Sequence, residues 1–350
     1  MFGSLRFLSL RGGVRGRAAA AMVVALAAAY ISVPAAHANT TIAFQANTGE
    51  LWYWGNEPGY EHGAGHDLHL GMMKGTSPSI TDDGFIRSWL HIAFQANTGN
   101  LWEYSSSSGA GHDRHLGMMA GTSPSLATDA VAETIAFQAN TGSLWQWGYS
   151  SGGELLGPDN ALGSDLGGKL MKGTSPSING GEIAYQGHGG HLWTTRHGNT
   201  GLAMMPGTSP SSISSESTSR VAFQANNGHL WIWDGSRGRD LGLAMAAGTS
   251  PSMGGGEIAF QGANGHLWLW EGLGDGSETH LVTDSGLGMA MGTSPSLAGG
   301  GEIAFQANTG HLWLAAVGSK AGIGKAHDLH LGMMAGTSPS IVYNAWASQY

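Results

Sequence analysis

One stretch of eleven residues occurs seven times, with small changes, along this chain of 350 residues. The copy at residues 303–313 reads Ile-Ala-Phe-Gln-Ala-Asn-Thr-Gly-His-Leu-Trp, and the other copies begin at Ile42, Ile92, Ile135, Ile183, Val221 and Ile258. A second block of the form Leu-Gly-Met-Met-x-Gly-Thr-Ser-Pro-Ser follows the copies, as at residues 331–340. A repeat constrains the fold strongly, because every copy must form the same local structure and cover its hydrophobic surface against its neighbours.

Each copy predicts four short strands. Ile-Ala-Phe-Gln alternates with the period of two that a strand requires, and Asn-Thr-Gly supplies the residues of a tight hairpin turn. Leu-Trp then begins the returning strand, and a loop of variable length leads to the Leu-Gly-Met strand. After the Gly-Thr-Ser-Pro corner, a short Pro-Ser-Ile strand leads through a Gly-rich turn into the next repeat, as at residues 177–183.

Four antiparallel strands in each repeat of roughly 40 to 50 residues are typical of a β-propeller blade. A β-solenoid is the alternative, but its repeats are shorter and its strands parallel. The chain after residue 40 starts at the second strand of a unit, near Ile42, and ends after the first strand of a unit, near Ile341. We therefore expect an all-β fold, a seven-bladed β-propeller closed by pairing of the C-terminal strand in the N-terminal blade, which leaves no open edge.

The first 38 residues predict a secretory signal peptide, and residues 39–350 the propeller domain. Arg6, Arg11, Arg15 and Arg17 precede an apolar run at residues 18–31, and Ala-His-Ala at residues 36–38 matches a cleavage site. A membrane anchor is the alternative, but the run is short for a span, which needs about 20 residues. We therefore expect secretion without membrane insertion.

The rest of the chain is acidic, which excludes one class of partner. Residues 39–350 carry 11 basic and 24 acidic residues, since four of the 15 basic residues and none of the acidic ones lie before residue 39. No basic face is expected, and therefore no nucleic-acid partner. The chain has no Cys, so its stability must come from packing.

Aromatic residues at two positions of the repeat are candidate ligand contacts. The first position is always Trp, and packing between blades is a sufficient role for it: Trp52, Trp102, Trp145, Trp193, Trp231, Trp268 and Trp313. The second position, two residues later, varies: Trp54, Tyr104, Trp147, Thr195, Trp233, Trp270 and Ala315. Because this position tolerates Thr and Ala, we expect it to be partly exposed in a groove between blades, where an aromatic ring can stack on the C–H face of a sugar.

Neutral polar residues also recur in every repeat. The Gln of each first block, such as Gln45, is expected to bond the backbone of a neighbouring blade, and the Thr-Ser corner to bond within its own turn. Seven copies of Asn, Thr and Ser beside aromatic residues nevertheless supply donors and acceptors that suit a hydroxyl-rich ligand.

An Asp or Asn precedes each Leu-Gly-Met strand, and three copies extend to His-Asp-x-His, at residues 66–69, 112–115 and 327–330. Metal binding is conceivable, but four repeats lack the motif and adjacent residues on a strand point to opposite faces. We therefore expect no metal and no cofactor. The sequence contains no Cys nucleophile, Gly-x-Ser-x-Gly elbow or phosphate-binding loop, so we expect no enzyme.

The two blocks together resemble the PLL-like bacterial lectins, seven-bladed β-propellers that bind fucose-type and O-methylated sugars. The resemblance covers residues 41–342. It implies a secreted, multivalent, non-enzymatic lectin that binds glycans between adjacent blades. The implied sugar contacts are Trp52, Trp102, Trp145, Trp231, Trp313, Trp54, Tyr104, Trp147, Trp233, Trp270, Asn47, Asn97, Asn140, Asn226, Asn308, Thr76, Ser77, Thr122, Ser123, Thr249 and Ser250.

The fourth and sixth repeats depart from this pattern at the turn, where His188 and Ala263 replace Asn. We expect the sites of these two repeats to be silent. A structural or protein-docking propeller without sugar binding is the other function class that the residues leave open, and assembly into a homo-oligomer is left open as well.

Overall fold

The computed structural model describes residues 39–55, 63–82, 89–129, 132–150, 163–214, 219–272, 280–318 and 322–344. The chain divides into two units, Met1–Ala35 and Ala36–Tyr350, and the second unit contains all of the described residues. The predicted signal peptide therefore lies outside the described residues. Nothing in the described part of the chain forms a helix that is long and apolar enough to cross a membrane.

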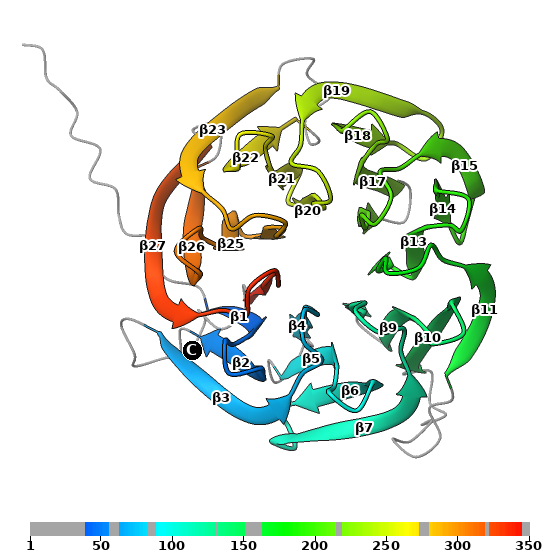
Figure 1. The fold of residues 1–350 in the computed structure, drawn as a ribbon, viewed down its shortest axis with the longest axis vertical. Helices are drawn as coiled ribbons and strands as arrows, with labels where there is room; N and C mark the ends of the chain where they lie inside the picture. The colour runs from blue at the N-terminus through cyan, green and yellow to red at the C-terminus, as the bar shows by residue number, and fades with distance from the viewer. Residues whose placement is uncertain are drawn as a thin grey trace, which may run out of the picture. The chain divides into compact units, whose positions relative to one another are not determined.

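Seven four-stranded antiparallel sheets, called blades 1 to 7, follow one another around a central axis (Figure 1). The strands of each blade are named here from the centre to the periphery. Blade 1 contains β28 (Ser340–Asn344), β1 (Asn39–Gln45), β2 (Glu50–Gly55) and β3 (Ala64–Gly71). Blade 2 contains β4 (Ser79–Asp82), β5 (Leu90–Gln95), β6 (Asn100–Ser105) and β7 (Ala110–Gly117). Blade 3 contains β8 (Ser125–Asp129), β9 (Ala132–Gln138), β10 (Ser143–Ser150) and β11 (Ser164–Lys169).

The remaining blades have the same order. Blade 4 contains β12 (Ser177–Asn179), β13 (Glu182–Gln186), β14 (His191–Thr194) and β15 (Gly198–Ala203). Blade 5 contains β16 (Ser211–Ser214), β17 (Ser219–Gln224), β18 (His229–Trp233) and β19 (Gly238–Ala244). Blade 6 contains β20 (Ser252–Gly254), β21 (Glu257–Gln261), β22 (His266–Glu271) and β23 (Leu281–Gly288). Blade 7 contains β24 (Ser296–Ala298), β25 (Glu302–Gln306), β26 (His311–Gly318) and β27 (Gly322–Gly332).

The predicted ring closure is confirmed. The strand β28 from the end of the chain pairs antiparallel with β1, and Ile341 lies opposite Ile42. The seven-bladed, all-β fold with four antiparallel strands per blade is therefore the one that the repeat predicts.

Two closed rings of hydrogen bonds join the blades near the axis. In the first ring, the backbone N–H of the corner serine of each blade donates to the Oγ atom of the corner serine in the next blade, at 2.9 Å throughout; the serines are Ser77, Ser123, Ser175, Ser209, Ser250, Ser294 and Ser338. In the second ring, the first serine of each innermost strand accepts a backbone N–H from the next blade at 2.9–3.1 Å; these are Ser79, Ser125, Ser177, Ser211, Ser252, Ser296 and Ser340. The two rings donate in opposite directions around the axis.

The hydrophobic core lies between the blades. In the interface of blades 7 and 1, Ile42, Phe44 and Trp54 pack with Leu312 and Met333 of the preceding blade. This arrangement recurs because alternate residues of each inner strand face opposite neighbours.

The repeated Gln has the role predicted for it. In blade 1, Gln45 Nε2 donates to the carbonyl oxygen of Met73 at 3.1 Å, and its Oε1 accepts the N–H of Gly75 at 3.2 Å. Both partners belong to the link that leads into blade 2.

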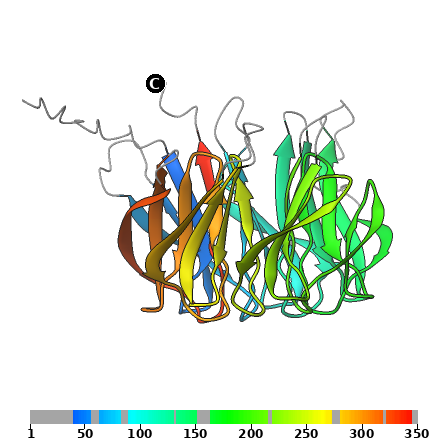
Figure 2. The same cartoon turned by 90° about the horizontal axis from the view of Figure 1, so that it is seen from above.

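The short turns and the links between blades lie on one side of the propeller. The turn between β1 and β2 and the link between β3 and β4 are at the same ends of the antiparallel strands, and this side is the lower one in Figure 2. The candidate site described next is at this side.

Candidate functional site

The structure corrects the predicted exposure of the variable aromatic position. The constant Trp packs against a cluster between blades in all seven blades, as expected, and is also partly exposed, from Trp52 to Trp313. The variable position was expected to be partly exposed but is buried at Trp54, Tyr104, Trp147, Trp233 and Trp270, with exposed fractions of 1–9%. Of the variable position, only Thr195 is exposed in the described residues.

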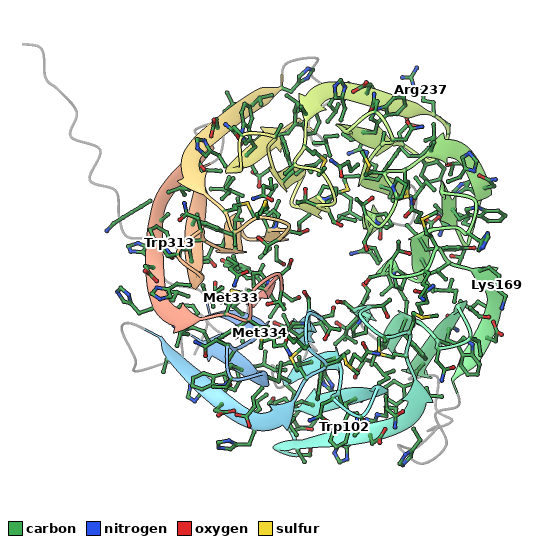
Figure 3. The ribbon with its side chains drawn as sticks, viewed as in Figure 1. Trp102, Lys169, Arg237, Trp313, Met333 and Met334 are labelled. Atoms are coloured by element: carbon green, nitrogen blue, oxygen red, sulfur yellow. The ribbon has the colours of Figure 1, made fainter. Side chains whose placement is uncertain are left out.

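Side chains of the preceding blade cover the variable position. The guanidinium group of Arg114, in blade 2, lies 4.2 Å from the ring centroid of Trp147 in blade 3. In the same way, the ring of His197, in blade 4, contacts Trp233 of blade 5 edge-on, with centroids 4.8 Å apart. The constant Trp is nearer the turn side, and Figure 3 shows Trp102 and Trp313 near the outer strands of their blades.

A polar residue lies directly opposite every constant Trp on the outermost strand. The register pairs Trp52 with Asp67 in blade 1 and Trp313 with Asp328 in blade 7, and the same pairing joins the equivalent residues of the other blades: Trp102 with Asp113, Trp145 with Asp165, Trp193 with Asn199, Trp231 with Asp240 and Trp268 with Asp284. Directly opposed residues point to the same face of a sheet. Each blade therefore presents an indole ring and a carboxylate or amide together toward the preceding blade.

A β-bulge fixes the orientation of this acid. In each blade the register shifts next to the constant Trp, and the Asp or Asn side chain accepts the backbone N–H of the residue two positions later, for example at 2.7 Å from His330 N to Asp328 Oδ1. In blade 5 the same bond joins Gly242 N to Asp240 Oδ1 at 2.8 Å. Sequence reasoning considered these residues only as metal ligands, although their sevenfold recurrence was visible.

Hydrogen bonds lower the pKa of the bulge carboxylates in blades 5, 6 and 7. Partial burial raises the pKa of Asp240, but the donors Gly242 N–H, His229 and Asn227 outweigh it and hold the pKa below its usual value. The pKa of Asp284 is lowered for the same reasons. An ionised carboxylate accepts hydrogen bonds and cannot serve as a general acid.

The turn Asn residues contact the preceding blade. In blade 1 the N–H of Asn47 donates to the carbonyl oxygen of Gly332 at 3.1 Å. The Nδ2 atom of Asn47 would lie 2.5 Å from a Cβ atom at Gly332, so a larger residue there would displace the amide. The same contact joins Asn97 to Gly71, Asn140 to Gly117 and Asn308 to Gly288. In blade 5 the N–H of Asn226 makes the same backbone bond at 3.1 Å with Ala203, where a methyl group is present. These turn residues therefore lie against the outermost strand of the preceding blade.

The corner residues lie elsewhere. Thr76, Thr122 and Thr249 are fully buried, and each hydroxyl donates to a carbonyl oxygen of its own turn at 2.8 Å. Ser77, Ser123 and Ser250 belong to the first serine ring near the axis. The structure thus gives the three serines a role in closing the propeller and the three threonines a role within their own turns.

The indole ring has two orientations, set by the residue before the turn. In blades 1, 2, 3, 5 and 7 this residue is Ala, and the planes of the Trp and the neighbouring Phe make angles of 41–47°. In blades 4 and 6 it is Gly, and the angles are 24° and 33°. A Cβ atom at Gly187 would lie 2.5 Å from Trp193 Cδ1, so the second orientation exists only where the methyl group is missing.

The two orientations differ in the hydrogen bonding of the indole N–H. In the five Ala blades the Nε1 atoms of Trp52, Trp102, Trp145, Trp231 and Trp313 are buried without a hydrogen-bond partner. In blade 6 the Nε1 atom of Trp268 donates to Asn264 Oδ1 at 3.0 Å. A buried donor without a partner costs free energy, so the five Ala sites gain if a ligand or water supplies an acceptor.

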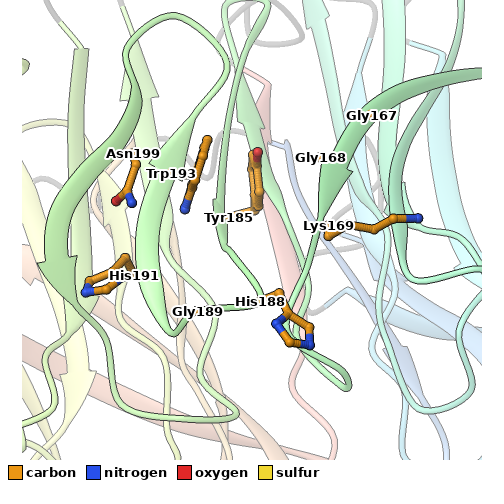
Figure 4. Close-up of a pocket in the computed structure, with 9 residues that line it drawn as sticks. All are labelled: Gly167, Gly168, Lys169, Tyr185, His188, Gly189, His191, Trp193 and Asn199. Carbon is orange, nitrogen blue, oxygen red and sulfur yellow. The ribbon is translucent and has the colours of Figure 1, made fainter.

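One of the grooves contains a pocket, between blades 3 and 4 (Figure 4). Its volume is about 280 Å³. The lining residues are Gly167, Gly168 and Lys169 from β11 and Tyr185, His188, Gly189, His191, Trp193 and Asn199 from blade 4. It contains the constant Trp, the polar residue opposite to it and the turn residue, which are the parts that recur in every groove.

Changes at four positions explain why the pocket is here. Gly168 stands where the other blades have Leu, such as Leu331, whose methyl groups contact Gly65 on the outer strand of the next blade. The hydroxyl of Tyr185, which replaces Phe, takes part of this space and lies 2.6 Å from where a Cβ of Gly168 would be. Gly187 turns the indole ring, and His188 replaces the turn Asn. The fourth repeat, expected to be silent, therefore has the largest change in its site.

A separate charged cluster lies between blades 2 and 3. His91 Nδ1 is 3.0 Å from Glu103 Oε1 and 2.9 Å from Glu133 Oε2, and Arg114 pairs with Glu103. Burial lowers the pKa of His91, but the two carboxylates outweigh it and raise the pKa to about 10. Burial and the adjacent Glu103 raise the pKa of Glu133 to about 6 in spite of His91. Two cations thus balance two buried carboxylates, which gives the cluster a structural role.

The propeller is distantly similar in structure to several proteins of known structure. No family model matches the chain, and no curated protein sequence matches it significantly. The propeller is similar to AofleA from Arthrobotrys oligospora, with a TM-score of 0.47, 12% identity, and coverage of 78% of this chain and 91% of that protein. It is similar to the Aleuria aurantia lectin, described as a six-bladed propeller with a novel fucose recognition mode, with a TM-score of 0.43, 15% identity and coverage of 70% and 91%. It is also similar to TolB from Acinetobacter baumannii, with a TM-score of 0.48, 8% identity and coverage of 87% and 66%.

Proposed function

We propose that this protein is a secreted, multivalent lectin that binds fucose-type or O-methylated sugars in the grooves between blades. The observation that carries the proposal is the pairing of a partly exposed Trp with an Asp or Asn in all seven blades. An indole face stacks on the C–H groups of a sugar, and a carboxylate next to it accepts hydrogen bonds from the sugar hydroxyls.

The carboxylates at the constant Trp of blades 5, 6 and 7 support binding without catalysis in those grooves. Hydrolysis of a glycosidic bond requires one carboxyl group that stays protonated and a second at a fixed distance from it. The bulge carboxylates Asp240, Asp284 and Asp328 have lowered pKa values instead. The acid with a raised pKa near 6, Glu133, is buried and paired with His91.

Repetition gives such a protein its affinity for surfaces. A site with one stacking ring and a few hydrogen bonds typically binds with millimolar to micromolar affinity, worth roughly 4 to 8 kcal/mol. Several sites on one rigid scaffold raise the avidity for a glycan-coated surface by a factor of roughly 10² or more. We therefore expect weak binding of free sugars and much tighter binding of multivalent glycoconjugates.

The test uses the chain at residues 39–350 on a glycan array, followed by competition with free L-fucose and its O-methylated derivatives. Binding to fucose-type or O-methylated glycans that the free sugars compete away would support the proposal. Trp231→Ala and Asp240→Ala, which alter the same groove, should each lower by one the number of sugar sites measured by isothermal titration calorimetry. A folded protein that binds no glycan would instead be a docking propeller.

A further inference from the structure

The third residue of the bulge divides the blades into two groups. In four blades it is Gly with a positive φ: Gly167, Gly201, Gly242 and Gly286. In blades 1, 2 and 7 it is His69, His115 and His330, with φ of 54–56°. Among the described residues these histidines are the non-glycine residues with positive φ. A side chain at this backbone conformation costs free energy, and such strain often accompanies a function.

In blade 7 the strained histidine meets two more metal-binding side chains. His330 Nδ1 is 3.5 Å from Asp328 Oδ2, and His311 Nδ1 from the adjacent strand β26 is 3.0 Å from the same oxygen. The two imidazole rings are nearly perpendicular, with an angle of 77° and centroids 6.2 Å apart. One ligand atom from each residue lies within 4.8 Å of the others.

The carboxylate of this cluster is already oriented. Asp328 Oδ1 accepts the backbone N–H of His330 at 2.7 Å, so that Oδ2 faces both imidazole rings. Fixed orientation of a ligand by a hydrogen bond outside the metal shell is a general feature of metal sites. The sequence-based objection, that neighbouring residues of a strand face opposite sides, does not apply here. Residues 328 and 330 are two positions apart and therefore not adjacent, and the third ligand, His311, comes from the neighbouring strand β26.

We propose that His311, Asp328 and His330 bind a divalent transition-metal ion such as Zn²⁺. Ligand atoms around tetrahedral zinc are about 3.3 Å apart when the bonds are about 2.0 Å, and the two oxygen–nitrogen separations here bracket that value. Two imidazoles and one carboxylate are a common ligand set for zinc, and water completes the shell. His330 has 82% of its side chain exposed, so an ion can reach the site directly from solvent.

The other blades provide internal controls. Blades 5 and 6 contain the equivalents of His311 and Asp328, with His229 Nδ1 3.1 Å from Asp240 and His266 Nδ1 3.0 Å from Asp284, but Gly at the third position. Blade 1 has a Glu50, Asp67 and His69 cluster with one imidazole, which predicts weaker zinc binding.

The test measures Zn²⁺ binding to residues 39–350 by isothermal titration calorimetry in a weakly coordinating buffer. We expect one Zn²⁺ ion to bind with a micromolar or lower dissociation constant. In His330→Gly the affinity for this ion should fall at least tenfold. Because glycine relieves the positive φ, the metal-free variant should melt at the same or a higher temperature. His311→Gln should also weaken Zn²⁺ binding, although this variant keeps the positive φ of His330. No zinc binding by the wild type, or equal binding by both variants, would overturn the proposal.

A gain of function gives an independent readout. Gly242→His places the missing imidazole beside His229 and Asp240 in blade 5 and should add a second zinc ion per chain. The variant could melt at or below the wild-type temperature and bind no second Zn²⁺ ion. That result would count against the geometry proposed for blade 7. Neither experiment depends on sugar binding.

Discussion

The backbone N–H of Ser338 donates a hydrogen bond of 2.9 Å to the Oγ atom of Ser77, although the two residues are 261 positions apart in the sequence. This bond joins the last corner of the chain to the first and closes the first serine ring. The pairing of β28 with β1 closes the same junction through a sheet. The closed ring therefore depends on the last strand that the chain forms.

Deleting residues 340–350 should lower the melting temperature strongly. The deletion removes β28, exposes the edge of β1 and breaks the second serine ring at blade 1. Ser77→Ala removes one ring acceptor and should cost about 0.5–1.5 kcal/mol of unfolding free energy. The exposed Ser164→Ala is the matched control. Thermal unfolding that is unchanged by the deletion would contradict closure through β28.

The two tryptophans of blade 5 should separate stability from binding. Trp233 is 4% exposed, so Trp233→Ala should cost on the order of 3–5 kcal/mol of unfolding free energy. Trp231 is partly exposed beside Asp240, so Trp231→Ala should cost less stability and remove sugar binding in that groove. Urea unfolding and calorimetric titration check the pair. A larger stability loss in Trp231→Ala would reverse these assignments.

Filling the pocket between blades 3 and 4 should make its sugar binding like that of the other grooves without unfolding the propeller. The double variant Gly168→Leu with Tyr185→Phe restores the two residues that the other grooves have at these positions. The Tyr185→Phe change is needed because the hydroxyl is 2.6 Å from the Cβ position of residue 168. We expect the same number of sugar sites by titration and a changed affinity at one of them, with Tyr185→Phe alone as the control. Unchanged affinity at every site of the double variant would show that the pocket does not affect sugar binding.

The ion pairs of His91 predict a stability that depends on pH. Because the pKa of His91 is raised to about 10 in the folded protein from an ordinary 6.5, its contribution is fully present below pH 6.5. The contribution is lost as the pH rises through about 10. The difference in unfolding free energy between the wild type and His91→Gln should therefore shrink from about pH 7 to about pH 10. A constant difference, or an equal trend in the exposed control His188→Gln, would argue against this effect.

The fold could be predicted because its signals are local and repeated. Alternation in Ile-Ala-Phe-Gln, the Asn-Thr-Gly turn and the offset of the two ends each follow from residues close in sequence, and the pairing of Ile42 with Ile341 confirms them. The exposure of the aromatic residues could not be predicted in this way. Trp52 and Trp54 face the same side of β2, and the residues that cover the variable position, such as Arg114 over Trp147, come from the preceding blade.

Prediction of the candidate site would have required two structural features that are difficult to recognise in a sequence. The bulge places Asp67 opposite Trp52 after a loop whose length differs between repeats, so spacing alone does not reveal the pair. The change from Ala to Gly at Gly187 is visible in the sequence, but its effect becomes clear only from the position of the Trp193 indole.

The separation of the serine rings from the grooves also has a consequence for how such a chain can change over generations. Residues that hold the propeller together lie on the inner strands, whereas Gly168, His188 and Asn199 lie at the outer strands and turns. A substitution at the periphery alters one groove and leaves the six others unchanged. Duplicated units can therefore diversify one at a time under selection, and blade 4 already differs from its sister units without any change in its inner serines.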